Sequence, residues 1–136
     1  MQHSVVEPEE TIMTKRLSMA AAAALLIGCG AAQAQELGGT WQRDTGASRV
    51  RFAKCGEALC GTISWLKDAS GPAKVGQRIF YDMKPNGAGK WSGSAFNPED
   101  GKTYSGTMAL SGDTLTTSGC VMGGLICRSV KWSKVN

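Results

Sequence analysis

The segment formed by residues 90–110 decides the fold of this chain. It reads Lys90-Trp91-Ser92-Gly93-Ser94-Ala95-Phe96, then Asn97-Pro98-Glu99-Asp100-Gly101-Lys102, then Thr103-Tyr104-Ser105-Gly106-Thr107-Met108-Ala109-Leu110. Its two ends alternate large or apolar residues with small or polar ones, which is typical of strands with one buried face. Its middle is rich in turn formers, because Pro98 fixes φ and Gly101 supplies a positive φ. The segment therefore predicts a β-hairpin.

The same alternation and turn chemistry recur on both sides of this hairpin. Strands are expected over residues 38–43, 48–55, 61–65, 78–82, 90–96, 103–110, 114–118 and 126–135. Short connections between successive strands favour an up-and-down order, and about eight strands are enough to close a small barrel. The sequence therefore predicts an all-β, antiparallel up-and-down barrel, with an open sandwich as the alternative.

Glycines share alternating rows with large side chains on several of these strands. The expected rows are Gly61 with Ile63 and Trp65, Gly93 with Trp91, and Gly106 with Tyr104 and Met108. Small residues beside large ones are typical of the interior of a narrow barrel. We therefore expect these rows to face inward.

The N-terminal residues 1–34 are interpreted as an extension followed by a signal peptide, and residues 35–136 as the barrel domain. Lys15 and Arg16 precede an apolar run over residues 17–28, and Ala32-Gln33-Ala34 has the form of a cleavage site. The apolar run is shorter than the roughly 20 residues that span a bilayer. Cleavage after Ala34 would give a periplasmic or secreted bacterial protein without a transmembrane span.

The same region also contains a candidate signal for a second kind of processing, lipidation. Leu26-Ile27-Gly28-Cys29 resembles the sequence that precedes a lipidated cysteine in bacterial lipoproteins, and acyl chains there would anchor the domain to a membrane. We favour cleavage after Ala34, because that site follows the apolar run at the usual distance.

Four cysteines follow the predicted cleavage site, and an even number in a small exported domain indicates disulfides. Three pairings are conceivable. We expect Cys55–Cys60 and Cys120–Cys127, because each pair brackets a hairpin turn and residues facing across a turn meet the geometry of a disulfide. A four-thiolate zinc site is the alternative, but the six residues between Cys120 and Cys127 exceed the usual two to four between zinc ligands, and export favours oxidation.

Residue types that carry much of enzyme chemistry are scarce. The one histidine, His3, lies before the signal, so the mature chain has no Ser-His or Cys-His nucleophile and no histidine base. Glu99 and Asp100 form the visible carboxylate pair, but an aspartate before Gly101 is what a turn requires. No nucleotide fingerprint is present, and the net charge of +4 is scattered, which gives no support to nucleic-acid binding. We expect a non-catalytic protein without metal or cofactor.

Aromatic residues and one late arginine remain as candidate ligand-binding residues. The set is Trp41, Trp65, Trp91, Tyr104, Arg128 and Trp132. These rings would line a pocket for a small apolar ligand, or they would fill the core of a solid barrel. Arg128 would stack on a core tryptophan or meet an anionic ligand.

Several short segments also resemble a known family. They are, in order, Gly39-Thr40-Trp41, Cys55-Gly56 with Leu59-Cys60-Gly61 and Trp65, Trp91-Ser92-Gly93, Asn97-Pro98 with Asp100-Gly101-Lys102 and Tyr104, Gly119-Cys120, and Arg128 with Trp132. In this order they resemble an uncharacterised family of small secreted bacterial proteins with a lipocalin-like barrel. The resemblance implies a periplasmic location, a calycin-type barrel and a small apolar ligand, and it implies no catalytic residues.

Two functions from different classes therefore stay open, and a carboxylate enzyme is a third that the missing histidine and free thiol disfavour. The first is a periplasmic or secreted barrel that binds or carries a small apolar molecule. The second is a structural or interaction module of the envelope with a solid core, which would contact a protein through the loops at residues 67–77 and 97–102.

Overall fold

The computed structural model describes residues 37–136, so the predicted signal peptide and Cys29 lie outside the described residues. In chain order the strands are β1 (Gly39–Arg43), β2 (Ser48–Cys55), β3 (Ala58–Leu66), β4 (Arg78–Pro85), β5 (Lys90–Asn97), β6 (Lys102–Ser111), β7 (Thr114–Val121) and β8 (Ile126–Lys134), with one 3-10 turn, η2 (Met122–Gly124). The predicted hairpin of residues 90–110 is formed by β5 and β6. Within the described part of the chain, no helix is long and apolar enough to cross a membrane.

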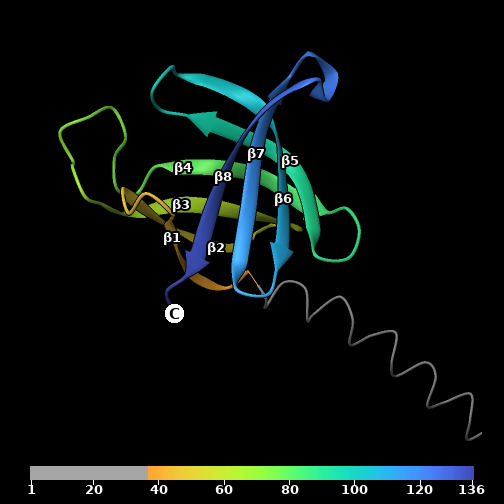
Figure 1. Cartoon of the computed structure of the whole chain (residues 1–136), viewed down its shortest axis with the longest axis horizontal. Coiled ribbons are helices and arrows are strands. Elements are labelled where there is room, and N and C mark those ends of the chain that lie inside the picture. The colour runs from red at the N-terminus through yellow and green to blue at the C-terminus, as the bar shows by residue number, and fades with distance from the viewer. Residues whose placement is uncertain (1–36) are drawn as a thin grey trace, which may run out of the picture. The chain divides into compact units, whose positions relative to one another are not determined.

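The eight strands form a closed up-and-down barrel (Figure 1). Each strand pairs antiparallel with the next, and β1 closes the sheet by pairing with β8, where Trp41 lies opposite Lys134. This last pairing confirms the predicted barrel and excludes the open sandwich. Because every connection joins neighbouring antiparallel strands, successive turns lie at opposite ends of the barrel.

The barrel therefore has two ends with different contents. The terminus end holds the start of β1, the end of β8 and the turns β2–β3, β4–β5 and β6–β7. The loop end holds the turns β1–β2, β3–β4, β5–β6 and β7–β8. These two names are kept below.

The interior is filled by large apolar side chains from every strand. The buried cluster comprises Leu37, Trp41, Val50, Phe52, Leu59, Phe80, Met83, Trp91, Met108, Leu115 and Trp132. The ring centroid of Phe80 lies 5.5 Å from that of Phe52 and 6.3 Å from that of Trp132. A Cβ at Gly61 would lie 2.7 Å from the Phe80 ring and 2.8 Å from the Phe52 ring. The glycine thus gives the two phenyl rings their space, as the alternation of small and large residues predicted.

One predicted row is wrong at its last residue. Val50 pairs with Ile63, but Arg49 pairs with Trp65, so β3 contains an extra residue at Ser64. Such a bulge shifts the following side chain to the opposite face of the sheet. Trp65 is therefore on the outer surface, 39% exposed, with the Arg49 guanidinium 5.0 Å from its ring centroid.

A second irregularity makes β4 longer than predicted. Asp82 has a φ of 52°, and the pairing with β5 shifts between Tyr81 and Lys84. The strand resumes afterwards and places Met83 in the core. Gly93 of β5 is required beside this bulge, because a Cβ there would lie 2.6 Å from the Asp82 carbonyl oxygen.

Both predicted disulfides are confirmed. Cys55–Cys60 spans the β2–β3 turn, with Cα atoms 5.9 Å apart, and Cys120–Cys127 spans the β7–β8 turn, with Cα atoms 4.1 Å apart. One disulfide therefore constrains a turn at each end of the barrel.

Candidate functional site

Three of the six candidate ligand-binding residues are core residues. Trp41, Trp91 and Trp132 are almost fully buried. The indole N–H of Trp132 donates to Thr117 Oγ1 at 2.9 Å, and that of Trp41 donates to the Leu37 carbonyl oxygen at 3.2 Å. Their rings contact other core side chains and two of their polar groups already have partners, so they fill the barrel.

The other three candidates lie outside the core. Trp65 is on the outer face of β3. Tyr104 and Arg128 are at the loop end, half-buried and exposed respectively. The Tyr104 hydroxyl donates to Asp100 Oδ2, and Arg128 is close enough that its charge acts on the pKa of Tyr104. The six candidates therefore do not converge on one pocket.

Lys134 takes the position over a core tryptophan that was considered for Arg128. The Lys134 Nζ lies 5.7 Å from the Trp41 ring centroid. Lys134 and Arg128 share an alternating row of β8, but Lys134 is at the terminus end, where Trp41 lies opposite it. The cation that covers the core at the terminus end is thus Lys134, the last residue of β8.

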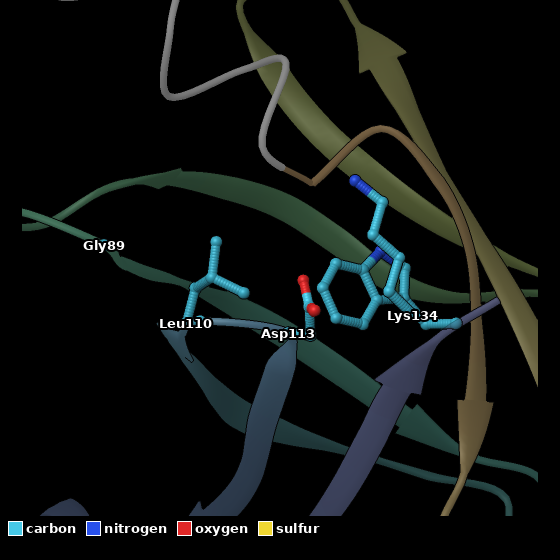
Figure 2. Close-up of a pocket in the computed structure, with 6 residues that line it drawn as sticks. Gly89, Leu110, Asp113 and Lys134 are labelled. Atoms are coloured by element: carbon cyan, nitrogen blue, oxygen red, sulfur yellow. The ribbon is translucent and has the colours of Figure 1, made fainter. Parts of the chain in front are cut away.

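A hollow lies at this terminus end, beside Trp41. It has a volume of about 430 Å³ and is lined by Trp41, Gly89, Leu110, Gly112, Asp113 and Lys134. Figure 2 shows the Asp113 carboxylate between the Leu110 side chain and Lys134. A smaller hollow of about 250 Å³ follows β5, β6 and β7.

Backbone hydrogen bonds hold this terminus-end hollow in shape. The Leu110 N–H donates to the Gly89 carbonyl oxygen at 2.8 Å, which joins the β4–β5 turn to the end of β6. The Lys134 N–H donates to the Asp113 carbonyl oxygen at 3.3 Å, which joins the β6–β7 turn to the end of β8. The position of the site is therefore fixed by strand ends and tight turns.

The site combines an apolar wall with two opposite charges. Leu110 and Trp41 supply the wall, and Asp113 and Lys134 supply a carboxylate and an ammonium. Among residues 37–136, neither charge forms an ion pair. A small molecule with an apolar body and a polar end fits this chemistry, and the volume is within the usual range for ligand pockets, about 300–1,000 Å³.

The two carboxylates with a resolved pKa shift, Asp68 and Asp100, are both at the loop end, and the pKa of each is lowered. The pKa of Asp100 is lowered first by the hydroxyl of Tyr104 and then by the Lys102 N–H, and the pKa of Asp68 is lowered by two hydrogen bonds from Ser70. The pKa of Tyr104 is raised, because losing its proton would break its hydrogen bond to a carboxylate. In the described part of the chain, no three His, Cys, Asp or Glu residues are grouped as metal ligands.

Sequence reasoning missed most of the hollow. Gly112 and Asp113 were interpreted only as turn formers, and Leu110 only as a strand residue. A usable signal was present, since Lys134 continues the alternating row of Arg128, Val130 and Trp132. Which turn the end of that row meets depends on how the barrel closes.

Comparison with known proteins gives a family and a fold. The family model described as "Uncharacterized protein conserved in bacteria (DUF2147)" matches residues 39–134, and the chain belongs to this family. No curated protein matches the sequence. Among solved structures, the chain is similar to protein HP1028 from the human pathogen Helicobacter pylori, described as belonging to the lipocalin family, with 20% identity and a TM-score of 0.63 over 74% of this chain and 83% of that one. This likeness shows a lipocalin-like fold.

Proposed function

We propose that this chain is an exported, non-catalytic barrel that binds a small, mostly apolar ligand in the terminus-end hollow. The observation that carries the proposal is the hollow itself, in which Leu110 and Trp41 lie beside Asp113 and Lys134. The central cavity of a carrier barrel is not the site, because the interior is occupied by the buried cluster around Trp41, Trp91 and Trp132. The ligand instead lies across the mouth of the barrel.

The exported location is supported by the cysteines. Two disulfides in a small domain are typical of an oxidising compartment such as the periplasm. A non-catalytic role is supported by the described residues, which include no histidine and whose four cysteines are all paired in disulfides.

The proposal is tested with 8-anilinonaphthalene-1-sulfonate, a fluorescent probe that has an apolar body and an anionic group. We expect saturable binding, with NMR shifts at the amides of Gly89, Leu110 and Gly112. Lys134→Ala should weaken binding about two- to fivefold, because exposed charge pairs contribute up to about 1 kcal/mol. Lys131→Ala, an equally charged change on the outer face of the same strand, should leave it unchanged.

Two results would contradict the terminus-end site. One is the absence of saturable binding both for this probe and for decanoate. The other is binding whose NMR shifts fall at the loop end, at Tyr104 and Arg128, and which responds equally to Lys134→Ala and Lys131→Ala.

A second function is favoured by the packed interior, namely an interaction module of the bacterial envelope with a solid core. Its contact surfaces would be the loops at residues 67–77 and 97–102, both at the loop end. Cross-linking in whole cells from a photoreactive residue placed in each loop tests it. Failure to capture one reproducible envelope protein from either loop, with export and folding intact, would remove this function.

A further inference from the structure

The tip of the β7–β8 hairpin, residues 121–126, exposes an unusual amount of apolar surface. It consists of Val121, Met122, Gly123, Gly124, Leu125 and Ile126. Leu125 is 85% exposed, Met122 68% and Ile126 58%. Half of the large apolar residues that the described chain exposes are therefore in this one turn, and large exposed apolar groups that cluster mark a binding surface.

The tip is held in a fixed shape. Cys120–Cys127 joins the two strands at its base, and Leu125 N–H donates to the Met122 carbonyl oxygen across it. Met122 keeps a φ of 55°, a left-handed conformation that glycine adopts more easily. The apolar side chains are thus presented by a stapled turn and do not fold back onto the barrel.

The charge of the hairpin indicates what covers this tip. Residues 114–134 contain the basic residues Arg128, Lys131 and Lys134 and no acidic residue. Arg128 follows the tip directly after Cys127 and is exposed, and Lys131 is exposed further along β8. In Figure 1 the tip and the β5–β6 turn, which carries Glu99 and Asp100, are separate projections, and Asp100 is hydrogen-bonded to Tyr104. A convex aliphatic tip with a basic neighbour and no acid in its hairpin matches the surface of an anionic bilayer.

We propose that the β7–β8 tip inserts reversibly into the surface of an anionic lipid bilayer. Leu125, Ile126 and Met122 enter the boundary between headgroups and acyl chains, and Arg128 stays at the level of the lipid phosphates. Insertion is shallow, because the backbone groups of the turn need water or headgroups as partners. Since the tip is at the loop end, this orientation leaves the hollow beside Trp41 open to solvent at the other end of the barrel.

The test uses the exported protein, purified with its N-terminus identified by mass spectrometry, so that all variants share one N-terminus. Each protein is sedimented with vesicles of phosphatidylcholine alone and with vesicles that also contain about 30% phosphatidylglycerol, an anionic lipid. We expect binding to the anionic vesicles. Leu125→Asp should abolish it, and Arg128→Gln should reduce it about fivefold, on the anionic vesicles alone.

Val75→Asp is the matched control, since Val75 is also a highly exposed apolar residue at the loop end, in the β3–β4 loop. It should bind as the unsubstituted protein does. Insertion itself is read from Leu125→Trp, whose fluorescence should be quenched by brominated acyl chains, whereas that of Val75→Trp should not. Circular dichroism spectra of all variants should coincide, because both positions are exposed.

Three results would overturn the proposal. The first is equal sedimentation with and without phosphatidylglycerol. The second is vesicle binding of Leu125→Asp equal to that of Val75→Asp. The third is self-association that Leu125→Asp abolishes in analytical ultracentrifugation without vesicles, because a second copy of the chain would then cover the tip.

Discussion

The two ends of this barrel are built from the same strands, but apolar side chains are buried at one end and exposed at the other. At the terminus end, Leu37 and Trp41 are buried and Lys134 lies over the indole ring. At the loop end, Leu125 and Ile126 remain in solvent on a turn fixed by a disulfide. From this comparison we expect stability to come mainly from the terminus end and the centre, and the exposed apolar side chains of the loop end to be available for contacts.

The largest effect on stability is expected from a substitution at the terminus end. Trp41→Ala removes a ring that is almost fully buried, and we expect unfolding free energy to fall by about 3–5 kcal/mol. Trp65→Ala is the control, because it removes the same side chain from the outer face, and it should cost less than about 1 kcal/mol. Urea denaturation measures both. Equal losses would mean that the terminus end is not where stability is concentrated.

The disulfides allow the two ends to be compared directly. Replacing Cys120 and Cys127 with serine should lower stability by about 2–3 kcal/mol, and replacing Cys55 and Cys60 should lower it by a similar amount, because the closed loops are of similar length. The two pairs should differ in vesicle binding, which we expect to weaken only when the loop-end disulfide is absent. An equal loss of vesicle binding in both double variants would contradict this expectation, because the effect would then not depend on the disulfide at the base of the tip.

A smaller effect, of opposite sign, is expected at the tip itself. Met122→Gly removes a side chain from a left-handed residue, and we expect stability to rise by about 0.5–1 kcal/mol. Vesicle binding should fall, because Met122 contributes apolar surface. Val121→Gly, in an extended conformation beside it, is the control and should not stabilise the protein. A destabilised Met122→Gly would contradict the view that Met122 is kept for contact.

The smallest effect concerns Asp100 and Tyr104. The pKa of Asp100 is lowered in the fold, so its hydrogen bonds add stability above the pKa of the unfolded chain, about 3.9, and this stability is lost as the pH falls through the lower folded value. Tyr104→Phe should return the pKa of Asp100 toward its ordinary value in an NMR titration. The pKa of Asp68, which Ser70 lowers, should not move in that variant.

Most of the fold could be predicted from local sequence. β2 occupies the predicted residues 48–55, and both disulfides join the predicted cysteines. Turn residues and period-2 alternation act between neighbours in the chain, so the sequence displays them directly. The two bulges, at Ser64 and near Asp82, were not visible, because an extra residue is accepted only where the partner strand allows it.

The candidate site was predictable only in part. Trp91 was rightly placed on an inward row, and Trp41 and Trp132 were named as rings that would line a pocket or fill the core. Which of the two an inward ring does depends on what faces it across the barrel. Phe52 and Phe80 meet through the space that Gly61 leaves, and Lys134 reaches Trp41 only because β8 returns to β1.

The sequence by itself determined the all-β class, the order of the strands, the turns and the two staples, because these follow from interactions between residues close in the chain. Tertiary structure alone decided that Trp65 faces solvent, that Lys134 and not Arg128 covers a core tryptophan, and that Leu110 and Asp113 meet beside Trp41. The reason is physical: barrel closure brings together residues from the first and last strands, and register between strands is set by packing across the whole sheet.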